Sequence, residues 1–164
     1  MRLRRTMTAT PRLPSLAVLV ALAAAACSTL PPATLGPSGP IAARAASQRL
    51  VWSSQNIRSY TFSIERQCLC PEDVRGPFDV TVVEGGATHV RYQGGVAVAD
   101  RIQNLPKTME ALFELVLANV ATEPDIVYDD RFGFPLRVAL DPMKNAIDDE
   151  VTYVVSNFHV RPAP

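Results

Sequence analysis

Residues 59–67 read SYTFSIERQ, and this stretch decides the class of fold. Tyr60, Phe62 and Ile64 are apolar, and they alternate with a threonine, a serine and, after Ile64, a glutamate. This alternation has the two-residue period of a strand with one buried face. We therefore predict a strand over residues 59–67.

A hairpin is predicted directly downstream of this strand. Apolar and polar residues alternate over 78–82 and again over 89–92, and the two runs flank the sequence EGGA at 84–87. A glycine pair between two alternating runs is typical of a β-hairpin. The apolar stretch 96–99, which follows a second glycine pair, is too short to assign.

The second half of the chain predicts one helix and three strands. Thr108 is a good N-cap, and the apolar residues from there to Val120 recur at the spacing of one helical face. Alternating residues predict strands over 126–128, 136–140 and 151–155.

A first helix is predicted over residues 41–57, which are rich in Ala, Gln, Arg and Leu. Its apolar residues in approximate helical register, beside Trp52, are Ile41, Ala45, Leu50 and Ile57. The predicted order of elements is then α-β-β-β-α-β-β-β, with connections short enough for antiparallel neighbours. The sequence therefore predicts an α+β fold, two helices packed on a mainly antiparallel sheet, in a single domain over residues 41–164.

The first 26 residues have the three parts of a secretory signal peptide. Four arginines precede an apolar run over 13–26, which ends in alanines and is too short for a comfortable transmembrane helix. The segment Ala24-Ala25-Ala26-Cys27 resembles the lipobox of bacterial lipoproteins, in which the cysteine thiol carries diacylglycerol and becomes the N-terminus. Ala24 stands where that motif most often has Leu. The alternative is an ordinary signal peptide that leaves Cys27 as a free thiol.

Residues 27–40 are predicted to be the lipidated cysteine and a proline-rich tether. The thirteen residues after Cys27 include four prolines and no charge. At about 3.1 Å per residue they span at most about 40 Å, so the domain stays close to its bilayer. Ser28 occupies the position where Asp usually retains a lipoprotein in the inner membrane, so the resemblance implies the outer membrane in a Gram-negative host.

The charge balance excludes one class of partner. Four of the 16 basic residues lie in the predicted signal peptide, which leaves 12 basic residues against 16 acidic ones. A mildly acidic domain has no electrostatic reason to bind nucleic acid, because that requires clustered Lys and Arg.

The most distinctive motif of the predicted domain is Cys68-Leu69-Cys70-Pro71. In an unbroken strand both thiols share the parity of the buried residues, and their Cα atoms are about 6.6 Å apart, near the upper end of disulfide geometry. A structural disulfide is the preferred interpretation. The alternatives are thiol exchange with a partner, capture of a soft metal such as Cu(I), and free or intermolecular thiols.

The loop over residues 141–150 is a candidate calcium site. Its oxygen-bearing residues are Asp141, Asn145, Asp148, Asp149 and Glu150. Such loops suit calcium, although the central glycine and the ligand spacing of an EF-hand are absent. The competing interpretation is a solvated turn, in which Asp and Asn side chains close backbone hydrogen bonds.

No catalytic set can be identified in the sequence. His89 falls on the polar face of a predicted strand and His159 lies near the C-terminal end, so both are expected at the surface. The sequence has no recognisable Ser, His and Asp set, phosphate-binding loop or zinc spacing. We therefore expect a protein that is not an enzyme.

Seven short segments of the chain together resemble one known protein family. They are Trp52, SYTF at 59–62, CLCP at 68–71, GP at 76–77, VTV at 80–82, GFP at 133–135 and NAIDDE at 145–150. Together they resemble the bacterial family called domain of unknown function 6174, over about residues 50–158, and the Cys-x-Cys-Pro and Asn-Ala-x-Asp-Asp-Glu segments are the most specific. Phe134 stands where the family often has Tyr. The resemblance supports a lipoprotein domain and implies no assigned activity.

The preferred hypothesis is a non-enzymatic, membrane-anchored envelope lipoprotein that binds an unknown envelope protein through its sheet or its acidic loop. Its expected partners are that protein and the lipid bilayer, the latter through Cys27. One alternative is a thiol-redox or soft-metal handling protein that uses Cys68 and Cys70. The other is a calcium-stabilised binding module, and no further cofactor is expected.

Overall fold

The computed structural model describes residues 38–93, 102, 104–143, 146 and 148–162. All of them belong to one compact unit, Leu35–Pro164. The predicted signal peptide, Cys27, most of the tether and the apolar stretch 96–99 lie outside the described residues. None of the described helices is long and apolar enough to cross a membrane.

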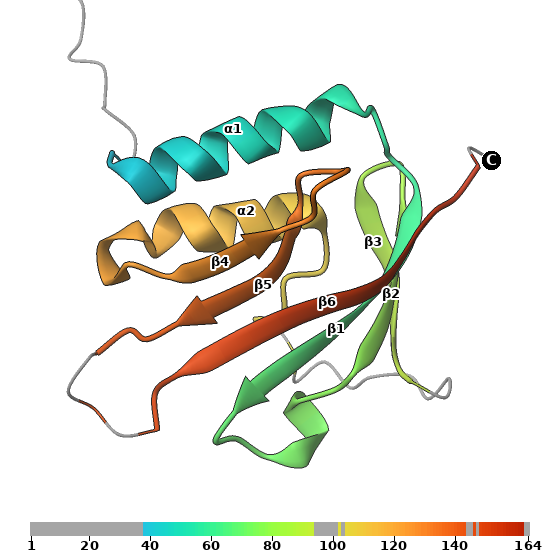
Figure 1. Ribbon diagram of the computed structural model, residues 1–164. Coiled ribbons are helices and arrows are strands. Elements are labelled where there is room, and N and C mark those ends of the chain that lie inside the picture. The colour runs from blue at the N-terminus through green and yellow to red at the C-terminus, as the bar shows by residue number, and fades with distance from the viewer. Residues whose placement is uncertain (1–37, 94–101, 103, 144–145, 147, 163–164) are drawn as a thin grey trace, which may run out of the picture. The chain divides into compact units, whose positions relative to one another are not determined.

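The unit is built on one six-stranded sheet (Figure 1). Its strands are β1 Tyr60–Cys68, β2 Phe78–Val83, β3 Gly86–Tyr92, β4 Asp125–Tyr128, β5 Pro135–Leu140 and β6 Val151–Val160. They lie in the order β3-β2-β1-β6-β5-β4, and all neighbouring pairs are antiparallel. The two longest strands, β1 and β6, therefore form the centre of the sheet. The predicted antiparallel sheet is confirmed.

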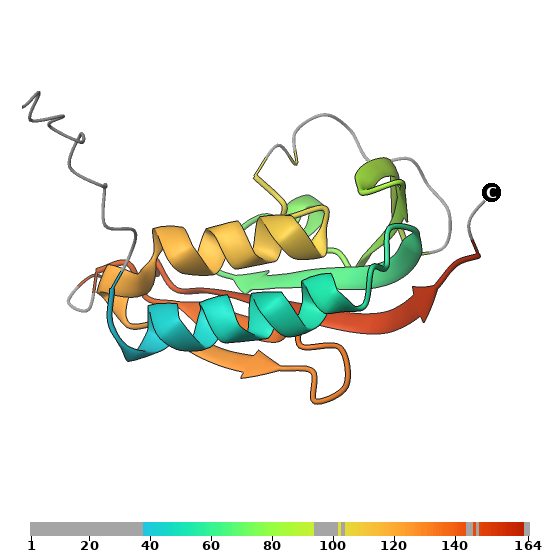
Figure 2. The ribbon, with the colours of Figure 1, turned by 90° about the horizontal axis from the view of Figure 1, so that it is seen from above.

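Two helices, α1 Pro40–Ser54 and α2 Met109–Ala118, lie side by side on the same face of the sheet (Figure 2). Short 3-10 turns, η1 Glu72–Val74 and η2 Val120–Thr122, follow β1 and α2. The order of helices and strands matches the predicted α-β-β-β-α-β-β-β. The fold is α+β, with helices on one face of the sheet.

The core lies between the helices and the sheet, because the apolar face of α2 and the apolar face of the strands, both predicted from the sequence, pack together there. Thr108 caps α2 by accepting a hydrogen bond from the Ala111 amide at 3.0 Å. The buried face of α2 consists of Met109, Leu112, Phe113 and Val116. It packs over alternate strand residues that are also buried, including Tyr60, Phe62, Ile64, Phe78, Val80, Val82 and Val138.

The inward face of α1 differs from the prediction. Leu50 is 71% exposed, whereas Ala42, Ala45 and Trp52 are buried. With 3.6 residues per turn, positions 42, 45 and 52 share one stripe and position 50 points elsewhere. The helix also ends at Ser54 and not at Ile57, because Asn56 adopts a left-handed backbone with φ of 52°.

A partly buried polar network joins α1, α2 and β1. Trp52 Nε1 donates to Glu110 Oε1 at 2.9 Å, and the Tyr60 hydroxyl donates to Glu110 Oε2 at 3.3 Å. The same hydroxyl accepts a hydrogen bond from the Met109 amide at 2.9 Å, at the start of α2. Burial raises the pKa of Tyr60, and the neighbouring Glu110 carboxylate adds to the shift. Tyr60 therefore stays neutral and fixes the first turn of α2 over the sheet.

We expect Tyr60→Phe to lower the free energy of unfolding by about 1–3 kcal/mol, because it leaves a buried amide without its acceptor. Urea denaturation measures this loss. The matched control is Tyr92→Phe, which removes a hydroxyl that donates to the Asp73 carbonyl at an exposed site. Equal losses in the two variants would show that the Tyr60 network contributes no special stability.

The raised pKa of Tyr60 also predicts a pH dependence. An unfolded tyrosine ionises near pH ~10, whereas folded Tyr60 resists ionisation at that pH. The stabilisation is thus complete below pH ~10 and is lost as the pH rises further. Between pH 9 and 11 the wild type should lose more stability than Tyr60→Phe, and parallel losses in urea titrations would contradict the assignment.

Candidate functional site

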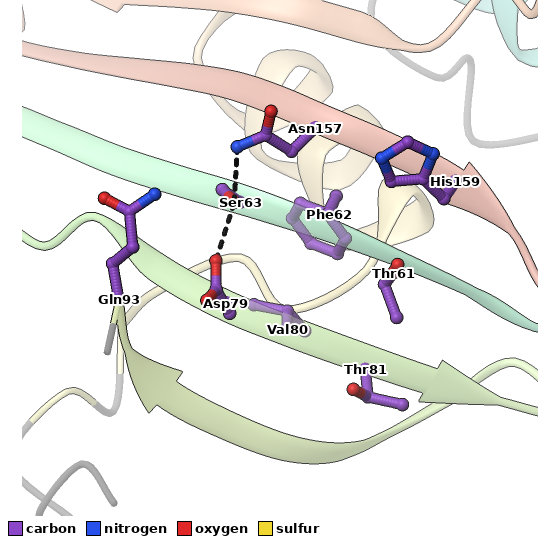
Figure 3. A pocket seen from close by; sticks show the side chains of 9 residues that line it. All are labelled: Thr61, Phe62, Ser63, Asp79, Val80, Thr81, Gln93, Asn157 and His159. Atoms are coloured by element: carbon purple, nitrogen blue, oxygen red, sulfur yellow. Dashed lines mark hydrogen bonds between the residues drawn. The ribbon is translucent and has the colours of Figure 1, made fainter. Parts of the chain in front are cut away.

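One groove of about 370 Å³ lies on the face of the sheet opposite the helices (Figure 3). We name it the sheet-face groove, and its lining residues are Thr61, Phe62, Ser63, Asp79, Val80, Thr81, Gln93, Asn157 and His159. Ser63 lies at its centre, where it donates to Asp79 Oδ1 at 2.7 Å and accepts from Asn157 Nδ2 at 3.2 Å. The network therefore connects β2, β1 and β6.

The geometry of the sheet-face groove does not fit nucleophilic catalysis. Ser63 is only 3% exposed, and its hydroxyl is engaged by Asp79 and Asn157. The imidazole of His159 lies apart from Ser63 in Figure 3, and within the described part of the chain the side-chain partners of Ser63 are Asp79 and Asn157. We interpret this network as a polar clamp between central strands. Both histidines are exposed, as predicted.

A second groove, of about 290 Å³, brings two distant sequence motifs together. We name it the motif groove, and its lining residues are Arg66, Cys68, Leu69, Cys70, Asn104, Asp148, Asp149, Glu150, Val151 and Tyr153. Its position follows from the central strand pair, because Cys68 at the end of β1 lies opposite Val151 at the start of β6. The residues that follow β1 must therefore lie beside those that precede β6.

Cys68 and Cys70 form a disulfide at one side of the motif groove. Their Cα atoms are 5.3 Å apart, less than the distance expected for an unbroken strand, because β1 ends at Cys68 and the chain bends at Leu69. Leu69 is 71% exposed. Arg75 Nε donates to the Cys70 carbonyl at 2.7 Å and so fixes the chain beyond the bond.

Arg66 is the residue of this groove that the sequence analysis missed. Its guanidinium carbon lies 5.4 Å from the centre of the Tyr153 ring. Its Nε and Nη2 atoms are buried, and neither has a hydrogen-bond partner among the described residues. The alternation of β1 could have identified it. Arg66 continues the inward-facing series Tyr60, Phe62 and Ile64, and a charged side chain is unusual on the buried face of a strand.

The acidic side of the groove also has a buried polar atom without a hydrogen-bond partner among the described residues. Asp149 Oδ2 accepts from the Met143 amide at 2.8 Å, while Asp149 Oδ1 is buried without a partner among the described residues. Asp148 and Glu150 on either side are exposed. The groove thus combines a guanidinium, a disulfide and three carboxylates.

The predicted calcium site is only partly described. Asp148, Asp149 and Glu150 line the motif groove, Asp141 is not among its lining residues, and Asn145 lies outside the described residues. Within the described part of the chain, no group of three or more His, Cys, Asp or Glu side chains is arranged to hold a metal ion. Calcium binding therefore stays a prediction.

Comparison with known proteins adds one finding. The model of a family described as a family of unknown function (DUF6174) matches residues 44–160. The match covers the described helices and strands almost completely. No curated protein and no solved structure matches the chain.

The span of the disulfide predicts that it contributes little to global stability. Because the bond closes a loop of only three residues, its effect on chain entropy amounts to about 1.6 kcal/mol. We expect the double variant Cys68→Ser, Cys70→Ser to lose no more than about 2 kcal/mol in urea denaturation. A loss above about 4 kcal/mol would instead identify the bond as a clamp of the whole unit.

Proposed function

The chain belongs to the family of unknown function DUF6174, and from this premise we propose that it is a lipid-anchored envelope protein with a non-enzymatic binding unit. Its partner is an envelope protein that docks at the motif groove. The observation that carries the proposal is the convergence of Cys68-Leu69-Cys70 and Asp148-Asp149-Glu150 on that one groove. These stretches belong to the two most specific segments of the family resemblance.

The anchor rests on the N-terminal sequence. Four arginines and an apolar run that ends in four alanines precede Cys27, which is the expected site of diacylglycerol attachment. The following tether limits the unit to about 40 Å from the bilayer. A partner must then lie in or near the same membrane, which is the outer membrane if the host is Gram-negative.

The chemistry of the motif groove supports recognition of a protein surface. Leu69 offers an exposed apolar side chain at its rim, and Asp148 and Glu150 are exposed acids. Three carboxylates against one guanidinium give the groove a net negative charge. Complementary charge steers partners and selects among them, so we propose a partner with a basic surface.

Lipidation is tested by the intact mass of the protein purified from its own membrane. We expect a chain that begins at Cys27 and carries acyl groups, and Cys27→Ser should lose both the acyl mass and the membrane association. Several buried acyl chains hold a protein stably, whereas removal of the anchor leaves only weak contacts. A mass without lipid would overturn the anchor.

Partner binding is tested by cross-linking in intact envelopes followed by purification of the full-length chain. We expect one reproducible partner, which Asp148→Asn with Glu150→Gln releases because the variant removes two rim charges. The matched control removes two acids at the opposite end of the sheet, through Glu84→Gln with Asp130→Asn, and should retain the partner. Capture that is equal in both variants would argue against the motif groove.

A further inference from the structure

Cys68, Cys70 and Arg66 all line the motif groove, although only the two cysteines are bonded. We propose that the Cys68–Cys70 disulfide is exchangeable and accepts two electrons from a protein dithiol. In this reaction Cys70 is the attacked sulfur, and Cys68 leaves as a thiolate beside Arg66. The inference rests on the proposed function and deepens it, because it gives the chemical class of the partner that docks at the groove.

The placement of the bond favours attack at Cys70. Cys68 is held in β1 opposite Val151, whereas Cys70 lies beyond the end of the strand. Between them, Leu69 projects into solvent and offers an apolar contact to an approaching protein. Exchange requires access to a sulfur, and both cysteines are half-buried residues that line the groove.

Arg66 makes Cys68 the better leaving group. Residues 66 and 68 are two apart in the same strand, so their side chains lie on one face. Arg66 Nε and Nη2 have no acceptor among the described residues, and a thiolate at Cys68 would supply both an acceptor and a counter-charge. A neighbouring guanidinium lowers a thiol pKa, and a thiol of lower pKa leaves faster.

Asp149 is the charged group of the groove that opposes a thiolate most, because its Oδ1 is buried without a partner among the described residues while its Oδ2 accepts from the Met143 amide. Asp148 and Glu150 are exposed, so solvent and salt screen them. Arg75, which donates to the Cys70 carbonyl, adds a positive charge on the other side of the bond. Tyr153 packs against the Arg66 guanidinium as a ring without charge.

The reaction conserves atoms and electrons. A thiolate of the partner attacks Cys70 Sγ, the Cys68–Cys70 bond breaks, and a mixed disulfide forms while Cys68 leaves as a thiolate. The second partner thiol, as a thiolate, then attacks the partner sulfur of the mixed disulfide and releases Cys70. The partner ends as a disulfide, and Cys68 and Cys70 end as two thiols once they take up the two protons that the dithiol gave up.

Single-cysteine variants of the full-length chain, purified in detergent, test which thiol is activated. Cys70→Ser leaves Cys68 in the groove, and Cys68→Ser leaves Cys70. The rate of iodoacetamide alkylation against pH gives each thiol pKa. We expect Cys68 to titrate at least one unit below the ordinary thiol value of about 8.5, and below Cys70. Equal pKa values would overturn the assignment of the leaving group.

Arg66 is tested in two settings. In the Cys70→Ser background, Arg66→Gln should return the Cys68 pKa to its ordinary range, Arg66→Lys should return it partly, and the control Arg75→Gln should leave it low. In the otherwise intact chain, Arg66→Gln should slow reduction of the disulfide by dithiothreitol about threefold or more. Urea midpoints confirm that each variant is folded, and an unchanged rate in folded Arg66→Gln would overturn the role of Arg66.

The exchange reaction itself is measured with a reduced Cys-x-x-Cys oxidoreductase as the probe. We expect electron transfer to the chain, followed by mass spectrometry after alkylation, and a trapped mixed disulfide at Cys70 when the second probe cysteine is replaced. Absence of transfer, while envelope cross-linking still captures a groove-dependent partner, would overturn exchange and leave the binding function standing. Electron transfer without any captured partner would overturn the binding function and leave disulfide exchange standing.

Discussion

The antiparallel pairing of β1 with β6 is the constraint on which the rest of the structure depends. These two strands form the centre of the sheet although half of the chain, residues 69–150, lies between them. Their register places Tyr60, Phe62 and Ile64 under the helices and Cys68 opposite Val151. A shift of one residue would send every core side chain of β1 to the other face, so the hydrophobic effect fixes the register. The motif groove is a consequence of that register, because it lies where β1 ends and β6 begins.

The helices are oriented by a small number of polar contacts within an apolar interface. Trp52 and Tyr60 both donate to the Glu110 carboxylate, and the Met109 amide donates to the Tyr60 hydroxyl, so each of the three elements contributes a partner. Apolar packing alone tolerates sliding, whereas buried hydrogen bonds are lost unless the geometry is kept. A close approach at Gly133 adds to this, since a Cβ atom there would lie 2.8 Å from the Gln48 carbonyl of α1. The β4–β5 turn is thereby held against the helix layer.

Local patterns predicted the elements well and the site only in part. Period-two alternation identified the strands, and Thr108 with the apolar stripe that follows it identified α2. Both are visible in the sequence because an element that buries one face has apolar residues at regular spacing. In α1 the buried stripe is mostly alanine, so apolar residues such as Leu50 misled the assignment of its face. The groove was not predictable, because it depends on which strands pair and in which register, and neither is encoded locally. The cysteine separation was overestimated for a local reason, the bend at Leu69.

Two features of the motif groove add little to the stability of the fold. Buried donors without partners, as in Arg66, destabilise a protein by about 1–3 kcal/mol or more when charged. A disulfide across three residues contributes only about 1.6 kcal/mol through chain entropy, which is comparable to the cost of one such donor. Departures of this kind from local rules are expected at functional sites and are compensated by the surrounding structure. Both departures occur where the acidic loop meets the cysteine pair. Their coincidence in one groove supports the proposed docking site more strongly than either feature does alone.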